Sequence, residues 1–124
     1  MEVLETNING CFEINPKLIY DSRGYFYESF NAARFREKTG LNIQFVQDNQ
    51  SFSERGVLRG LHLQKGIHAQ AKLVSVLKGK VLDVAIDLRK DSETFGQVYR
   101  TLLSEENKKQ LFIPRGCAHG FVVL

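Results

Sequence analysis

Short apolar runs separated by turn residues constrain the fold of this chain more than any other feature of its sequence. In residues 81–88 every second residue from Leu82 to Leu88 is apolar, so these side chains share one face of an extended strand. Similar runs, each long enough for a strand, follow one another along the chain at 43–53, 57–64, 71–77, 97–103, 110–114 and 119–124.

The spacing of the runs leaves room for one helix. Asn31 can cap its start, residues 32–38 are mostly good helix formers, and Gly40 ends it. Residues 78–80 have the length of a hairpin turn between two of the runs. Regularly spaced strands with one short helix predict an all-β fold, either an antiparallel sandwich or a barrel.

Length and composition further narrow the class of protein to which this chain can belong. A chain of 124 residues can bury one core, and 43% apolar with 25% charged residues is ordinary for a soluble protein. No window approaches the 18 apolar residues of a membrane helix, and the acidic start lacks the apolar region of a secretory signal. We expect one soluble, cytoplasmic domain, residues 1–124, without a membrane partner. Because the final run stops at Leu124 without a turn or polar tail, we expect the C-terminal segment of this domain to be absent.

Charge and cysteine content bear on partners. The net charge of +3 comes from scattered cations rather than a basic stripe, which argues against nucleic acid and favours a small anionic ligand. Cys11 and Cys117 have no metal-binding or redox spacing, so we expect buried free thiols.

The spacing Pro114-x-Gly116-x-x-His119 resembles the second motif of cupin barrels, in which a Pro-Gly turn delivers a histidine to the next strand. A metal-binding cupin also needs a His-x-His pair and a carboxylate. Residues 62–64 read His-Leu-Gln instead, and Lys72 stands near the place of the carboxylate. Because an ammonium repels a cation, we predict no metal ion.

His62 and Lys72 suggest a reaction. A histidine can act as a general base near neutral pH, and an ammonium can stabilise a developing oxyanion. A base beside an oxyanion stabiliser suits proton abstraction next to a carbonyl group. Side chains able to bind a phosphate, sugar or base lie in the same polar segments: Arg23, Tyr25, Phe26, Arg59 and His119.

Five blocks together make the similarity specific. The chain resembles the dTDP-4-dehydrorhamnose 3,5-epimerase family from near residue 10 to its last residue. The blocks, in family order and spacing, are Asp21-Ser22-Arg23-Gly24-Tyr25-Phe26-x-Glu28, Gln47-Asp48-Asn49-Gln50-Ser51, Leu58-Arg59-Gly60-Leu61-His62-x-Gln64, Gln70-x-Lys72-Leu73-Val74 and Ile113-Pro114-x-Gly116-x-Ala118-His119-Gly120-Phe121.

The resemblance implies a metal-independent cupin jelly roll without a cofactor, acting as a homodimer. It would invert C3 and C5 of dTDP-4-dehydro-6-deoxy-glucose in dTDP-L-rhamnose synthesis. The histidine matching His62 would take the proton, and the lysine matching Lys72 would contact the 4-keto oxygen. Residues that would hold the nucleotide sugar are Arg23, Glu28, Gln47, Asn49, Arg59 and His119, with Arg23 and Glu28 coming from the neighbouring subunit.

Several alternatives remain open. Leu63 replaces a commoner aromatic residue, residues 66–69 replace a proline-bearing turn, and the family's proton-donating tyrosine would follow residue 124. A related dTDP-sugar 3-epimerase or ketoisomerase, a catalytically incomplete dTDP-sugar-binding module and a metal-dependent cupin are the competing functions. Asp83 either supports the site by pairing with Lys72 or occupies an exposed strand position.

Overall fold

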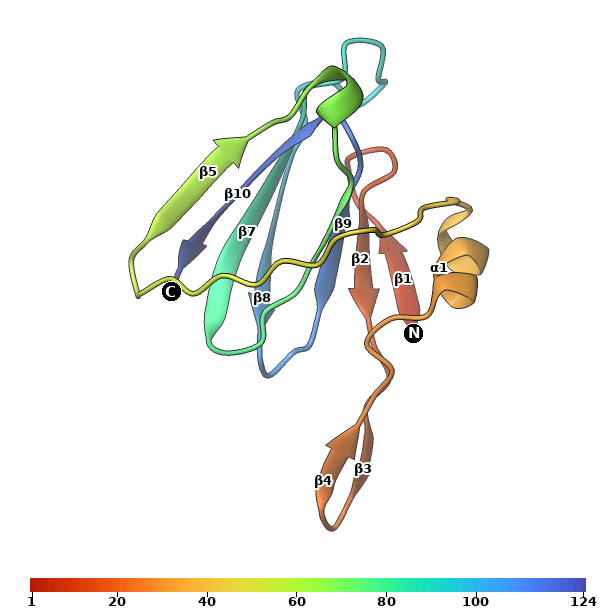
Figure 1. Cartoon of the computed structure of the whole chain (residues 1–124), viewed down its shortest axis with the longest axis vertical. Helices are drawn as coiled ribbons and strands as arrows, with labels where there is room; N and C mark the ends of the chain where they lie inside the picture. Colours follow the sequence, from red (N-terminus) through yellow and green to blue (C-terminus); the bar gives the residue numbers. More distant parts are fainter.

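Two antiparallel sheets of four strands each form the body of the protein (Figure 1). The computed structural model describes residues 1–124. The first sheet has the order β1 (Glu2–Glu5), β2 (Phe12–Asn15), β9 (Gln110–Ile113) and β6 (Lys72–Val74). The second sheet has the order β5 (Leu58–His62), β10 (Cys117–Val123), β7 (Lys80–Asp87) and β8 (Val98–Ser104).

The sheets enclose the main core between their inner faces. Pairing aligns Leu111 of β9 with Val74 of β6, and Val81 of β7 with Leu103 of β8. All four residues belong to one apolar cluster or pack against it, so these positions define the inner faces. The buried members of this cluster are Ile8, Cys11, Ala85, Leu103, Leu111, Ile113 and Cys117.

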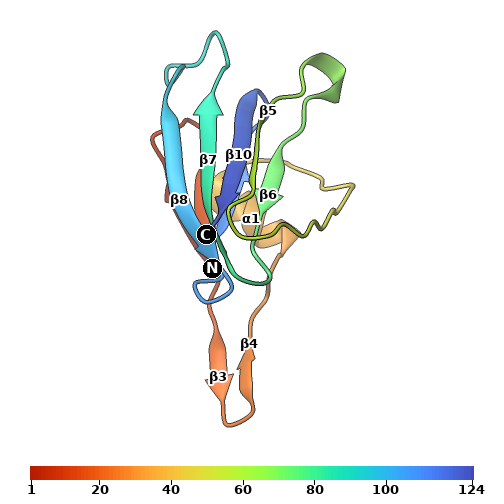
Figure 2. The same cartoon turned by 90° about the vertical axis from the view of Figure 1, so that its left-hand side faces the viewer.

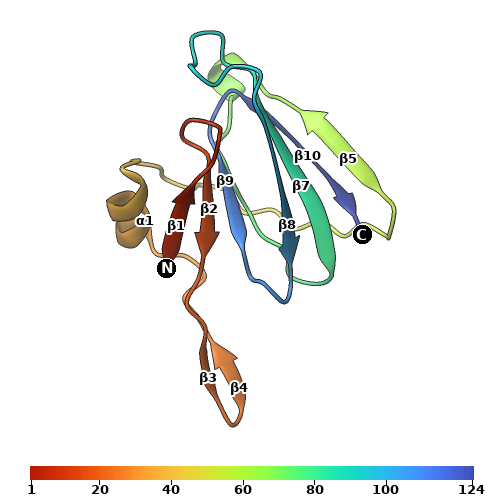
Figure 3. The same ribbon diagram turned by 180° about the vertical axis from the view of Figure 1, so that it is seen from behind.

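Helix α1 (Ala32–Thr39) covers the outer face of the first sheet (Figure 3). As predicted, the Asn31 side chain caps it by accepting a hydrogen bond from the Arg34 backbone N–H, and Gly40 ends it in a left-handed conformation. Phe35 is its one buried residue, with its ring 5.2 Å from that of Phe112. Burying a phenylalanine contributes about 1.5–3 kcal/mol, so this contact anchors the helix.

A hairpin and two irregular segments complete the chain. Strands β3 (Ile19–Asp21) and β4 (Gly24–Phe26) pair only with each other and project from the body (Figures 1 and 2). Residues 40–57 connect α1 to β5 without forming a strand. A 3₁₀ helix, Gly66–His68, precedes β6. No helix in the protein has both the length and the apolarity needed to cross a membrane.

Most predicted strands are confirmed, but two expectations were wrong. Residues 43–53 contain no strand, because Ile43 and Phe45 pack against the helix-side core while their backbone has no partner strand. The turn at 78–80 does not close a hairpin, because β6 pairs in the first sheet and β7 in the second. Of the two faces of 81–88, the one that carries Asp83 and Asp87 is the buried one.

Candidate active site

Strand register brings two of the predicted site residues onto facing inner surfaces. Lys72 is the partner of Ile113, a buried core residue, so Lys72 lies on the inner face of the first sheet. His62 at the end of β5 is the partner of His119 on β10. Paired residues share a face of a sheet, so the two histidines lie on the same side of the second sheet. His62 is exposed and His119 is buried.

His119 is held by a buried carboxylate. Its Nε2 lies 2.7 Å from Oδ1 of Asp83, which is completely buried. The second oxygen of Asp83, Oδ2, is also buried and has no hydrogen-bond partner. Burial raises the pKa of Asp83, while the hydrogen bond from His119 and the positive charges of His119 and Lys72 oppose that rise. An exposed position for Asp83 is therefore wrong, and the partner it hydrogen-bonds is His119 rather than Lys72.

Sequence reasoning missed this pair because it treated the two residues separately. Asp83 and Ala85 lie on one face of β7, and β10 places His119 opposite Ala85 and Phe121 opposite Asp83. His119 and Asp83 are thus diagonal neighbours on the inner face, within reach of each other's side chains. The alternation of β7 could have indicated this pair, provided that the polar face of the strand is taken as the buried one.

Two glycines let β5 and β10 approach unusually closely beside the histidines. A Cβ on Gly60 would lie 2.6 Å from the carbonyl oxygen of His119, and one on Gly120 would lie 2.7 Å from that of Arg59. The pairing of β10 with β5 also shifts register between His119 and Phe121. Larger residues would separate these backbones, so the two glycines set where Arg59 and His62 leave the sheet.

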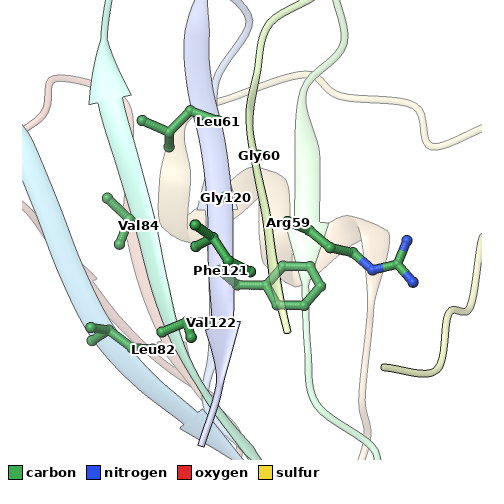
Figure 4. A pocket seen from close by; sticks show the side chains of 9 residues that line it. Arg59, Gly60, Leu61, Leu82, Val84, Gly120, Phe121 and Val122 are labelled. Atoms are coloured by element: carbon green, nitrogen blue, oxygen red, sulfur yellow. The ribbon is translucent and has the colours of Figure 1, made fainter. Parts of the chain in front are cut away.

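Arg59 leaves β5 toward the segment that precedes it. Its guanidinium donates from Nε to Oγ of Ser53, at 2.7 Å, and from Nη2 to the carbonyl oxygen of Phe52, at 3.3 Å. Figure 4 shows Arg59 pointing away from Leu61 and Val84, which line a pocket of about 300 Å³ on the second sheet. Leu82 and Val122 extend that pocket along the outer face, so it lies on the opposite side from the inner residues His119 and Asp83.

The remaining predicted binding residues lie apart from the inner faces. Arg23, at the exposed tip of the hairpin, pairs with Asp21 at 2.6 Å, and this side-chain hydrogen bond lowers the pKa of Asp21. Phe26 is 70% exposed. Glu28 accepts a hydrogen bond from Arg34 at 3.0 Å.

Gln47 and Asn49 lie on the connection between α1 and β5 that crosses from the first sheet to the second (Figure 1). Both side chains are exposed, and the Gln47 amide donates to Oδ1 of Asn49 at 3.1 Å. Within one chain, the structure thus brings His62, His119 and Lys72 to the inner faces but leaves the hairpin residues outside them.

The cysteines do not contribute to this site. Cys11 and Cys117 are free and buried, as expected. Burial raises the pKa of Cys11 to about 12 and that of Cys117 to about 11, so both stay protonated thiols at neutral pH. No three His, Cys, Asp or Glu side chains gather into a cluster suited to a metal ion.

Comparison with known proteins identifies the family. Residues 5–124 match the sequence model of dTDP-4-dehydrorhamnose 3,5-epimerase. The epimerase of Salmonella typhimurium is 52% identical over all 124 residues, which correspond to 68% of its length. The crystal structure of the Elizabethkingia anophelis epimerase is 61% identical, with a TM-score of 0.96 over this whole chain and 68% of its own. The chain belongs to this epimerase family.

Family membership confirms the expected fold and class of reaction. The two sheets and single helix are those of a cupin-type jelly roll, and the family's epimerases are isomerases acting on dTDP sugars of the rhamnose pathway. A structure from Legionella pneumophila, 54% identical with a TM-score of 0.93 over 99% of this chain and 65% of its own, was solved with dTDP-4-keto-L-rhamnose. The chain spans about two thirds of the length of the relatives it matches.

Proposed function

We propose that this chain carries the proton-abstracting part of a dTDP-4-dehydrorhamnose 3,5-epimerase, with His62 as base and Lys72 as oxyanion stabiliser. The observation that supports this most directly is register: His62 lies opposite His119 on the second sheet, and Lys72 is on the inner face of the first. The sugar's C4 ketone would lie between them. The substrate is dTDP-4-dehydro-6-deoxy-glucose, and the ligand of the Legionella relative, dTDP-4-keto-L-rhamnose, is the sugar that inversion at C3 and C5 would give.

The chemistry follows from the position of the ketone. C3 and C5 both flank C4, so loss of a proton from either carbon places negative charge on the C4 oxygen. His62 takes the proton through a neutral ring nitrogen, and the Lys72 ammonium stabilises the enolate oxygen as it forms. Inversion requires that a different group returns a proton to the opposite face of the carbon. Each centre thus loses and regains one proton, with no oxidation or reduction.

The nucleotide would be held by groups around the same opening. Arg59 supplies a planar donor fork suited to phosphate oxygens, and the His119 ring offers a further polar contact. Gln47 and Asn49 lie on the connection that crosses from one sheet to the other and offer amide groups to the nucleotide.

We further propose that the protein acts as a homodimer in the cytoplasm. Register places Leu58, Val122, Leu82 and Leu102 in one row across the outer face of the second sheet. Figure 2 shows no helix or strand covering that face, and Leu58 and Leu102 are largely exposed. An apolar row of this kind suits contact with a second copy of the chain. Arg23, Phe26 and Glu28 would then reach the site of the partner.

Replacing His62 by Asn tests the base directly. Asn keeps a polar side chain of similar size but cannot take up a proton. We expect the rate at which the C3 and C5 protons exchange with deuterated water to fall by about 10²–10⁴-fold. Proton NMR of the dTDP sugar measures this rate. The dissociation constant for dTDP should change less than about threefold, because His62 does not hold the nucleotide.

The matched control is His68→Asn. His68 lies in the 3₁₀ helix and is exposed, so this variant should exchange at the parent rate. If His62→Asn exchanges as fast as the parent, a different residue is the base and the proposed function is wrong.

A further inference from the structure

We propose that Asp83 is a positioning residue of the active site. One of its oxygens fixes the tautomer of His119, and the other is the acceptor for the ammonium of Lys72 once substrate is bound. This inference rests on the proposed function, because that function is what places Lys72 and His119 at the substrate.

Asp83 differs from Glu13, another buried carboxylate on the inner faces. Oε1 of Glu13 accepts hydrogen bonds from Thr101 at 2.6 Å, from Tyr99 and from Lys109. Thr101 and Tyr99 lie on β8, so Glu13 is held from the opposite sheet, and neither of its oxygens is both fully buried and unpaired. Asp83, although more deeply buried, has a single partner and leaves Oδ2 unpaired.

An unpaired buried acceptor is costly, roughly 1–3 kcal/mol. Native proteins keep few such groups, and those they keep call for an explanation. The side chains opposite Asp83 in the strand register, Thr101 and Phe121, do not hydrogen-bond Oδ2. Besides His119, the positive charge that acts on Asp83 belongs to Lys72, whose ammonium lies on the facing inner surface and makes no hydrogen bond or ion pair of its own.

The contact with Asp83 also determines where the hydrogen of the His119 ring lies. When Asp83 is ionised it only accepts hydrogen bonds, so Nε2 of His119 carries the hydrogen in its 2.7 Å contact with Oδ1. Nδ1 is then the one ring nitrogen that a ligand can meet. Asp83 therefore decides which nitrogen His119 presents, in the way that an acidic partner orients a catalytic histidine.

Together these contacts link two substrate-facing groups from different sheets. His119 comes from β10 and Lys72 from β6, and the Asp83 carboxylate on β7 interacts with both. A shared carboxylate would hold the ammonium at a fixed place beside the C4 oxygen. Losing it would let Lys72 and the imidazole ring adopt other orientations.

The first test uses the unmodified protein. Long-range proton–nitrogen NMR of the imidazole rings distinguishes hydrogen on Nε2 from hydrogen on Nδ1. We expect His119 to carry hydrogen on Nε2 over the whole pH range in which the protein is folded. A neutral His119 with its hydrogen on Nδ1 alone would overturn the inference, whether or not any variant folds.

The second test is Asp83→Asn in the full chain. We expect kcat to fall by about 100-fold or more, by analogy with Asp-to-Asn changes beside catalytic histidines, and dTDP affinity to fall by less than kcat, because Arg59 still holds the nucleotide. The His119 ring should lose its single tautomer, and the nitrogen resonance of the Lys72 ammonium should shift. Parent values for kcat and for both resonances would contradict the inference.

The matched control is Glu13→Gln, which also neutralises a buried inner-face carboxylate. It should lower stability but leave kcat and the His119 tautomer unchanged. The two proposals can fail separately. If His62→Asn exchanges protons at the parent rate, the proposed function is wrong. If His62→Asn is inactive but Asp83→Asn keeps the parent kcat, only the role of Asp83 is wrong.

Discussion

Three acidic side chains are buried in this protein, and the partners of each decide what it does. Asp87 is completely buried and accepts hydrogen bonds from Arg89, Ser92 and Thr94. These bonds fix the loop after β7 and hold the pKa of Asp87 well below its ordinary value. Glu13 accepts hydrogen bonds from three donors at Oε1, two of them on β8, and so ties the two sheets together. Asp83 alone keeps a fully buried oxygen without a hydrogen-bond partner. At the scale of single residues, unsatisfied hydrogen-bonding capacity separates the site from the scaffold.

Glu13→Gln should destabilise the protein in a pH-dependent way. Burial alone would raise the pKa of Glu13, but hydrogen bonds from Thr101, Tyr99 and Lys109 lower it below its ordinary value of 4.5. A lowered pKa stabilises the fold above the unfolded-state value, and this contribution is lost as pH falls through the folded-state value. We expect a loss of about 1–3 kcal/mol at pH 7, measured by urea unfolding, and a smaller difference from the parent below pH 4.

The control for this prediction is Glu5→Gln, since Glu5 is exposed on β1 and makes no side-chain hydrogen bond. Its unfolding midpoint should match that of the parent at both pH values. A pH-independent difference between Glu13→Gln and the parent would mean that the carboxylate charge is not what ties the sheets together.

At the scale of elements, the crossing of β5 and β10 determines the geometry of the site. His62, Arg59 and His119 come from strands whose backbones approach so closely that no side chain fits at Gly60 or Gly120. The edge strand β5 would otherwise sit farther from β10. The position of His62, the proposed base, thus depends on two residues that have no side chain of their own.

Gly120→Ala should disturb this crossing. Its Cβ would lie 2.7 Å from the carbonyl oxygen of Arg59, a backbone atom that can move only if β5 moves. We expect a stability loss of about 1–3 kcal/mol and a loss of both dTDP affinity and proton exchange, measured by calorimetry and deuterium incorporation.

Gly96→Ala is the matched control. Gly96 has a positive φ of 84°, and a methyl group added there would meet no atom within 4 Å, so this variant tests backbone strain without a clash. It should lose roughly 1 kcal/mol and keep the parent's dTDP affinity. Equal effects of the two substitutions on binding would contradict a specific role for the crossing.

Much of this arrangement was predictable from alternation and turn signals, as β7, β8, β10 and α1 illustrate. The strand predicted at residues 43–53 was wrong because an extended apolar pattern does not reveal whether a partner strand exists. For β7, alternation gives two faces but not which one is buried, and its acidic face is buried with hydrogen-bond partners from β10 and the loop after β7. His62 and Lys72 were found from motif spacing, whereas the Asp83–His119 pair required strand register.

At the scale of the whole molecule, the two sheets differ in what covers them. The first sheet has α1 and residues 41–45 packed on its outer face, whereas the outer row of the second sheet remains exposed. The β3–β4 hairpin points away from both (Figure 2). In the proposed homodimer, each chain would carry the proposed base and oxyanion stabiliser in its own body and extend Arg23 and Phe26 toward the other copy.

The projecting hairpin implies that two defective copies can restore one another. If Arg23 serves the neighbour's site, a mixed dimer of Arg23→Ala and His62→Asn chains contains one site with both residues intact. Random reassociation of equal amounts would repair about a quarter of all sites, so turnover should reappear after the two inactive proteins are unfolded and refolded together. Mixing His62→Asn with Lys72→Ala should restore nothing, because both residues serve the site of their own chain. Recovery in neither mixture would show that each copy works alone.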